Sequence, residues 1–241
     1  MAIAKVYRAT VSKDLAIAGS NEDSYCLRLR EEMPRAAVFD GASESFAARK
    51  WSRFLAEEWG RAPSRDWSWV ERAQSRYARS IANLQLTWAQ EAAAQRGSFS
   101  TIAYVQLDSE WLVFSAVGDS SIFLISDNSI RFSYPFTEES QFTSAPRALS
   151  SNPLDNRKNR ENLLEGIGQV RFKDFNTTHI LLATDAISAW LLTNDLEEKK
   201  TRLRQLMSCK TSQDFKELVV AERASRAMKI DDCTSVVMEV S

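Results

Sequence analysis

Cysteine and histidine are scarce in this chain of 241 residues, which holds three cysteines and one histidine. Cys26, Cys209 and Cys233 lie far apart in the sequence, and no two of them form a C-x-x-C pair. A zinc site built from Cys and His ligands is therefore not expected. Because the cysteines are also odd in number, the sequence predicts no disulfide framework, and we expect a reducing, cytoplasmic compartment.

Long apolar runs and a surplus of one charge are also missing. No segment approaches the about 18 uninterrupted apolar residues of a membrane-spanning helix, and residues 1–16 lack the long apolar core of a signal peptide. The formal net charge is −1, so no global basic field is available to attract nucleic acid or an anionic membrane. We therefore expect neither a membrane nor a nucleic acid as a partner.

What is present is the composition of an ordinary globular protein, with 44% apolar and 26% charged residues. The length lies within the range of one large α/β or β-sandwich domain. Since no internal repeat and no low-complexity linker interrupts the chain, we expect a single domain over residues 1–241.

Apolar runs bounded by turn residues predict strands, and apolar residues spaced three or four apart predict helices. The expected strands are residues 4–11, 24–30, 36–39, 100–107, 110–117, 121–126, 169–172, 179–184 and 234–240. The expected helices are about 43–59, with Ser43 as its N-cap, 68–95 and 195–226. The second has an apolar stripe from Val70 to Ala92, which predicts core or a helix-contact surface. Residues 133–165 lose this periodicity and predict a long surface loop or flap with some helix.

Acidic residues stand at the ends of five of these apolar segments. They are Glu22 and Asp23 in NEDSYCL, Asp40 in AVFDGAS, Asp119 in AVGDSS, Asp185 in ILLATDAIS, and Asp231 and Asp232 in KIDDCTSVV. One acid in such a place is usually part of a turn or a helix cap. Five that abut hydrophobic runs would repel one another and lose hydration unless a cation neutralised them. Oxygen ligands of this kind suit Mg²⁺ or Mn²⁺, and several carboxylates suggest two ions.

The order of these motifs resembles that of the metal-dependent protein serine/threonine phosphatases of type 2C, the PPM family. NED, FDGAS, GDSS, ATDAIS and IDDCTSVV match the family's ED pair and its DG, GDS, TDG or SDG, and DN or DD motifs. The similarity extends from Tyr7 to Val240, and DGASE in place of the eukaryotic DGHGG resembles a bacterial-type member. The resemblance implies an α+β fold: a four-layer α-β-β-α sandwich of two antiparallel sheets flanked by helix pairs.

The resemblance also implies which residues hold the metal. Asp40 would bridge two Mn²⁺ or Mg²⁺ ions, and Gly41 would offer its carbonyl oxygen to one of them. Asp185 and Asp231 would complete the coordination of the other ion. A hydroxide that bridges the two ions would then attack the phosphorus of phosphoserine or phosphothreonine in line, without a covalent phosphoenzyme.

Other positions have lesser implied roles or depart from the family pattern. Glu22 and Asp23 would act largely through metal-bound water, and Asp119, with Asp185, would face a third metal of the kind seen in bacterial relatives. The arginine that often precedes the ED pair and binds the substrate phosphate is missing. Lys13 or Arg8 could replace it, and we expect Lys13, because it precedes a loop of small residues. His179 opens a strand and is expected to be structural rather than a general acid.

The leading hypothesis is a metal-dependent phosphoprotein phosphatase whose substrate is phosphorylated by a bacterial Ser/Thr kinase. The missing arginine favours a second hypothesis, a pseudophosphatase that uses the same fold as a phosphoprotein-binding regulatory module. A third is a two-metal hydrolase of a small phosphate ester or nucleotide, although no Gly-rich phosphate loop supports it. A cysteine-nucleophile phosphatase is not expected, because the sequence has no C-x5-R loop.

Overall fold

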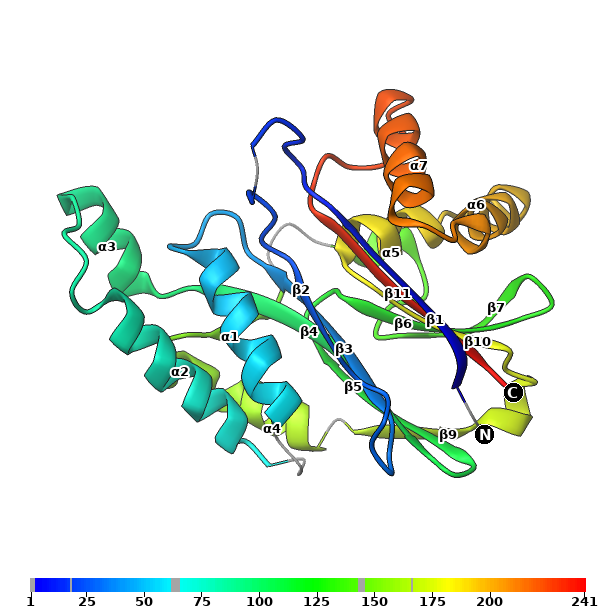
Figure 1. Cartoon of the computed structure of the whole chain (residues 1–241), viewed down its shortest axis with the longest axis horizontal. Helices are drawn as coiled ribbons and strands as arrows, with labels where there is room; N and C mark the ends of the chain where they lie inside the picture. Colours follow the sequence, from blue (N-terminus) through cyan, green and yellow to red (C-terminus); the bar gives the residue numbers. More distant parts are fainter. Residues whose placement is uncertain (1–2, 18, 62–65, 143–145, 166) are drawn as a thin grey trace.

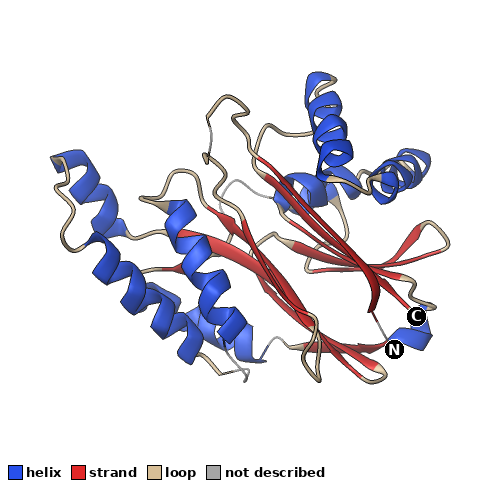
Figure 2. Ribbon diagram, in the orientation of Figure 1, coloured by secondary structure: helices blue, strands red, loops and turns tan. Residues whose placement is uncertain are grey.

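The computed structural model describes residues 3–17, 19–61, 66–142, 146–165 and 167–241. Their strands form two antiparallel sheets, drawn in Figures 1 and 2. The order in the first sheet is β1 (Ile3–Val11), β11 (Cys233–Val240), β10 (His179–Ala183), β6 (Ser121–Ser126) and β7 (Ser129–Tyr134). The order in the second sheet is β2 (Ser24–Arg28), β3 (Arg35–Gly41), β4 (Phe99–Asp108), β5 (Trp111–Val117) and β9 (Gly168–Arg171), and β8 (Leu149–Ser150) also pairs with β4.

Helices cover the outer face of each sheet, as Figure 1 shows. The second sheet carries α1 (Ala48–Arg61), α2 (Ser68–Ile81) and α4 (Arg157–Glu165), and the first sheet carries α5 (Asp185–Leu191), α6 (Leu196–Ser208) and α7 (Ser212–Ala224). A further helix, α3 (Trp88–Arg96), projects beyond α2 and buries none of its residues. These layers confirm the predicted α+β sandwich. No helix in the described ranges is long and apolar enough to cross a membrane.

Strand residues point alternately to the two faces of their sheet, and this alternation directs Asp40. In β3, Ala37 and Phe39 pack under α1 and α2. Ala36 and Val38 point the other way and pack between the two sheets. Because both faces are buried, the strand reads as a continuous apolar run. Asp40 continues the series of Ala36 and Val38, so its side chain is directed between the sheets at their end.

The first predicted helix begins later than expected. Residues 42–45 form a turn, in which the N–H of Ser45 donates to the carbonyl oxygen of Ala42 over 2.9 Å. Ala47 then has a positive φ of 55°, which no α-helical residue adopts. The helix α1 therefore begins at Ala48, and Ser43 is not its N-cap.

The segment 68–95 is two helices rather than one. Thr87 starts α3 with a capping box, in which its hydroxyl accepts from the N–H of Gln90 and the Gln90 side chain accepts from the N–H of Thr87. The apolar spacing continues across this break, but Leu84 and Trp88, which were expected in the core, are 46% and 84% exposed. The spacing of apolar residues alone could not locate the break. The capping residues Thr87 and Gln90 occupy positions between the apolar ones, where a continuous helix would also carry polar residues.

The segment 195–226 is also two helices, α6 and α7, and Thr211 forms a capping box at the start of α7. Three further strands or α-helices were not predicted from the sequence. One is β7, which lies at the edge of the first sheet. Another is β8, a strand of two residues that pairs with β4. The third is α5, which begins at Asp185 immediately beyond β10, so that this acid stands in the first turn of a helix.

The predicted flap, residues 133–165, is partly anchored to the second sheet. Asn156 and Asn159 each donate a hydrogen bond of 2.6 Å to a backbone carbonyl in or beside β8. Since β8 pairs with β4, these bonds fix residues 146–165 against the sheet. Residues 143–145 of the predicted flap lie outside the described residues.

Candidate metal centre

The acidic strand ends of the second sheet stand side by side. Asp40 lies next to the end of β3 and pairs with Thr101 near the start of β4. Ser24, the first residue of β2, pairs with Phe39 of β3. Antiparallel register therefore places Asp23 beside Asp40 at the same end of the sheet.

The strand ends of the first sheet converge in the same way. β10 pairs with both β6 and β11, and its last residue lies opposite the first residue of β6 and near the start of β11. Asp185 follows β10, Asp119 precedes β6, and Asp231 precedes β11. Antiparallel pairing thus brings these three acids together, although they are far apart in the sequence.

A cavity of about 500 Å³ opens where the strand ends of the two sheets face each other. Five of the residues predicted to hold metal line it: Asp40, Gly41, Asp119, Asp185 and Asp231. Ser43 and Lys229 also line it. Asp23 lies beside Asp40 in the register of β2 and β3 but is not among the lining residues. Lys13 contacts both Glu22 and Ser43, which lines the cavity, so Lys13 and Glu22 lie at the rim.

Crowding of the carboxylates changes their proton affinity. Burial, and then the charges of Asp23, Asp185, Asp119 and Asp231, hold the pKa of Asp40 well above its usual range. Burial, together with the Asp185 charge, raises the pKa of Asp119 to about 7. Raised pKa values at several neighbouring acids mean that too little positive charge lies near their carboxylates. A divalent cation is the group that relieves such a deficit.

Two carboxylate oxygens at the site, Asp23 Oδ1 and Asp185 Oδ1, are buried and have no hydrogen-bond partner within the described part of the chain. Their sister oxygens are engaged: Asp23 Oδ2 accepts from the hydroxyl of Thr184 over 3.0 Å, and Asp185 Oδ2 lies 3.0 Å from Lys229 Nζ. Burial and the charge of Asp232 raise the pKa of Asp23 well above its usual range. Leaving a buried polar atom unpaired costs about 1–3 kcal/mol, so these oxygens are open ligand positions.

Lys229 is the cavity residue that the sequence interpretation missed. Its Nζ lies 2.7 Å from Asp231 Oδ2 and 3.0 Å from Asp185 Oδ2. Burial lowers the pKa of Lys229, but its hydrogen bonds to these two carboxylates and their charges outweigh burial and raise the pKa overall. A single lysine two residues ahead of Asp231 carries no sequence signal of this contact, since most such lysines are solvated.

Lys13, the predicted phosphate contact, lies at the rim of the cavity. Its Nζ is 2.5 Å from Glu22 Oε2 and also donates to the hydroxyl of Ser43, which lines the cavity. Burial lowers the pKa of Lys13, and the bond to Glu22 reverses this and raises it. An ammonium has three donors, and the third has no partner among the residues that the structure describes, so it is available to a ligand. The role of Lys13 in binding phosphate stays a prediction.

Asp232 has a different task from its neighbour Asp231. Its Oδ1 and Oδ2 accept hydrogen bonds of 2.6 Å from the backbone N–H groups of Lys13 and Glu22. Both oxygens of Asp232 are therefore used to tie the β1–β2 connection to the start of β11. Asp231 instead directs its carboxylate to the cavity.

Gly41 is required by a close approach of backbone. A Cβ at this position would lie 2.7 Å from the carbonyl oxygen of Glu22 and 3.1 Å from that of Ala48. Backbone atoms on both sides cannot move apart cheaply, so only glycine fits. The same lack of a side chain leaves the Gly41 backbone open on the cavity wall.

These oxygen atoms are of the kind that binds a divalent cation, but they do not surround a common point as the ligands of a bound ion do. In the part of the chain that the structure describes, no group of three or more His, Cys, Asp or Glu side chains is arranged so that it could hold an ion. Mutual repulsion accounts for the separation of bare carboxylates. Carboxylate oxygens, two of them orphaned, with a backbone carbonyl nearby are the ligands that Mg²⁺ and Mn²⁺ prefer. An ion that took Asp185 Oδ2 and Asp231 Oδ2 as ligands would have to displace Lys229 from them.

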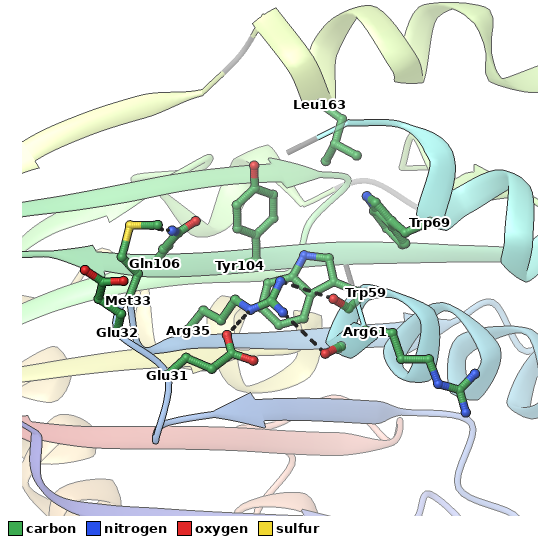
Figure 3. Close-up of a pocket in the computed structure, with 11 residues that line it drawn as sticks. Glu31, Glu32, Met33, Arg35, Trp59, Arg61, Trp69, Tyr104, Gln106 and Leu163 are labelled. Atoms are coloured by element: carbon green, nitrogen blue, oxygen red, sulfur yellow. Dashed lines mark hydrogen bonds and ion pairs between the residues drawn. The ribbon is translucent and has the colours of Figure 1, made fainter. Parts of the chain in front are cut away.

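A second cavity, of about 240 Å³, lies between the second sheet and its helices (Figure 3). Aromatic residues Trp59, Trp69 and Tyr104 line it. Its buried Arg35 donates to Glu31 Oε2 over 2.9 Å, and to the carbonyl oxygens of Trp59 and Gly60 over 3.3 Å. None of the acidic strand ends lines this cavity, and its buried guanidinium is engaged within the protein, so we do not assign it to the chemistry.

The chain shares its fold, two antiparallel sheets between layers of helices, with solved structures. Among solved structures the chain is similar to a bacterial serine phosphatase, with a TM-score of 0.63 and 14% identity over 98% of each chain. It is similar to the serine/threonine phosphatase Stp1 of Staphylococcus aureus, with a TM-score of 0.60 and 16% identity over 100% of this chain and 98% of that one. It is also similar to the catalytic domain of the serine/threonine phosphatase PstP in complex with two manganese ions, with a TM-score of 0.59 and 18% identity over 97% of each chain.

These similarities confirm the predicted resemblance at the level of the fold. No family model matches the chain, and no curated protein matches it. At identities of 14–18% the shared fold does not carry the activity with it. The activity must be argued from the site.

Proposed function

We propose that the chain is a metal-dependent phosphoprotein phosphatase that hydrolyses phosphoserine and phosphothreonine. One observation carries the proposal: five residues from four separate motifs line one cavity, namely Asp40, Gly41, Asp119, Asp185 and Asp231. The similar folds of known serine/threonine phosphatases, one of them solved with two manganese ions, support the same chemistry here.

In this proposal Asp40, the carbonyl oxygen of Gly41, Asp185 and Asp231 would hold two Mn²⁺ or Mg²⁺ ions, with Asp40 as a ligand common to both. Asp119, with Asp185, would hold a third ion. When bound, the ions supply a hydroxide nucleophile near neutral pH and stabilise charge on the phosphoryl oxygens. The chain's own contribution is position, because each acid stands at the end of a strand that its neighbours hold in register.

The remaining side chains orient water and substrate. Asp23 Oδ1 is buried and has no partner among the described residues, so beside Asp40 it would accept a hydrogen bond from a metal-bound water. Glu22 would likewise act through metal-bound water, at the rim. The third donor of Lys13, next to Ser43, is placed to bind a phosphoryl oxygen. We further propose that the substrate is a phosphoprotein of a bacterial Ser/Thr kinase in the cytoplasm.

A second candidate function, a regulatory module without hydrolysis, is favoured by one observation. The ammonium of Lys229 contacts both Asp185 and Asp231, where an ion would bind. If it stayed there, the cavity would hold a positive charge without a metal and could bind a phosphoprotein without cleaving it.

The test is hydrolysis of p-nitrophenyl phosphate, a phosphoserine peptide and a nucleotide, with Mn²⁺, with Mg²⁺ and with EDTA. The wild type should be active with either ion and inactive with EDTA. Asp40→Asn should lose about a hundredfold or more of the activity, because a shared charge at the reacting centre is lost. Asp174→Asn, an exposed acid outside the site, is the matched control.

Two results would redirect the proposal. A wild type as inactive in Mn²⁺ as Asp40→Asn would favour the regulatory module. A preference for the nucleotide over the phosphopeptide would favour a hydrolase of small phosphate esters.

A further inference from the structure

The contact of Lys229 with two carboxylates is the most specific feature of the cavity that the proposed function leaves unused. Lys229 lies in the connection between α7 and β11, and its ammonium faces Asp231 at 2.7 Å and Asp185 at 3.0 Å. These two acids come from different strand ends. The lysine therefore bridges them as a cation would.

The same two oxygens cannot serve the ammonium and a divalent ion at once. A bound Mn²⁺ or Mg²⁺ lies about 2.0–2.2 Å from each carboxylate oxygen, so it would occupy the space that the ammonium fills. Two positive charges at such a separation also repel strongly. An ion that uses Asp185 Oδ2 and Asp231 Oδ2 must displace Lys229, whereas an ion bound to the unpartnered Asp185 Oδ1 would still be repelled by the nearby ammonium.

The surroundings of Lys229 allow this displacement. Its side chain is 62% exposed, so the aliphatic stem is not packed in the interior and the ammonium can turn into solvent. Asp185 and Asp231 are much less exposed, at 14% and 23%, and stay in place. The mobile partner in this contact is the lysine, and the fixed partners are the acids.

We propose that Lys229 is a tethered cation that competes with divalent ions for Asp185 and Asp231 and so weakens metal binding at this centre. Without metal it offsets the repulsion between the two acids and keeps them close. With metal it is released toward the cavity and solvent. This inference rests on the proposed metal site, but it concerns affinity for the ion rather than hydrolysis.

The other lysine at the cavity is placed differently. Lys13 contacts Glu22, which does not line the cavity wall in the described residues, and its backbone is bound by Asp232. Removal of Lys13 would not free either Asp185 or Asp231. The inferred competition is therefore specific to Lys229.

The experiment measures Mn²⁺ binding directly, by titration calorimetry on metal-free protein at fixed pH and about 0.15 M salt, where distant surface charges are screened. Lys229→Met keeps the length of the side chain and removes the charge, and Lys229→Arg keeps the charge. Lys5→Met removes the same charge at the opposite end of β1 and is the matched control. Circular dichroism establishes that each variant is folded.

Lys229→Met should bind Mn²⁺ about fivefold to tenfold more tightly than the wild type, as expected for the loss of two partly exposed ion pairs. Lys229→Arg and Lys5→Met should bind like the wild type. Equal or weaker binding by folded Lys229→Met would overturn the inference, and wild-type binding in that case would leave the proposed metal site standing.

Two other outcomes separate the inference from the proposed function. If only Lys229→Met binds Mn²⁺, the competition is supported in its strongest form, and hydrolysis by the wild type is contradicted. If neither folded protein binds Mn²⁺, both the inference and the proposed metal centre are overturned.

Discussion

The guanidinium of Arg223, near the end of α7, donates a hydrogen bond to the backbone carbonyl of Asp231. Its other terminal nitrogen donates to the carbonyl oxygen of Ser12 over 2.9 Å. One side chain thus ties α7 to the end of β1 and to the turn ahead of β11. It fixes the backbone from which Asp231 reaches the cavity, without touching the cavity itself.

Arg223→Met should therefore weaken metal binding through Asp231. We expect the Mn²⁺ concentration for half-maximal activity to rise about tenfold to a hundredfold, the usual cost of losing a residue that orients a ligand. Arg223→Lys should recover part of the effect, and Lys216→Met, exposed on the same helix, should have none. A lower melting temperature with an unchanged Mn²⁺ dependence would show that Arg223 only stabilises the fold.

Gly41→Ala should damage the site by displacing backbone. The added Cβ would lie 2.7 Å from the Glu22 carbonyl oxygen, and neither chain segment can yield without disturbing β2 or β3. We expect a loss of about 1–3 kcal/mol in the free energy of unfolding, measured by urea denaturation. Ala42→Ser adds an atom at the next, exposed position and should leave stability within about 0.5 kcal/mol. An equally stable Gly41→Ala would contradict the close approach.

Asp231→Asn and Asp232→Asn should affect different properties, although the two residues are adjacent. The first should affect Mn²⁺ binding, and the second should affect stability. An amide at 232 turns a donor toward one of the two N–H groups of Lys13 and Glu22, so about 1–3 kcal/mol of stability should be lost. Asp231→Asn should change urea denaturation little and should reduce Mn²⁺ binding in calorimetry. The division of labour would be refuted if Asp232→Asn left stability unchanged and abolished Mn²⁺ binding.

Much of the site could be predicted because its residues stand at the ends of apolar runs. Asp40 and Asp185 stand at the ends of continuous apolar runs. Because a strand buried on both faces is apolar throughout, its end can be located in the sequence at the first acidic residue. Antiparallel pairing then brings such ends together without any further information. The layered fold follows from the same pattern, since two strand blocks and two groups of amphipathic helices have few ways to bury their faces.

The contacts made by single side chains could not be predicted. Lys229 and Arg223 reach Asp231 from a turn and a helix that have no motif of their own, and only the tertiary structure brings them there. The helix breaks were missed for a related reason. Leu84 and Trp88 continue the apolar spacing although they are exposed. Apolar residues at helical spacing can therefore continue past the point where the helix stops packing against the core.

The stability of the helical layer on the second sheet should depend on pH through Glu58 of α1. Its buried carboxylate lies 2.6 Å from Arg61, 2.8 Å from Arg76 and 3.1 Å from Arg72, so it joins α1 to α2. Burial raises the pKa of Glu58, but hydrogen bonds from the three arginines outweigh burial and lower the pKa below its ordinary value of 4.5. A lowered pKa in the folded state means that the contribution is fully present above about pH 4.5 and is lost as the pH falls through the folded value.

Glu58→Gln should therefore reduce the free energy of unfolding by about 1–3 kcal/mol at pH 7, because a charged acceptor for three guanidinium groups becomes neutral. The difference from the wild type should shrink as the pH falls below about 4.5 toward the lowered folded pKa, at which the wild-type carboxylate is protonated as well. Urea denaturation at several pH values measures it, and Glu71→Gln, exposed on α2, is the matched control. A difference that stayed constant down to pH 3 would mean that Glu58 acts through its shape and packing rather than its charge.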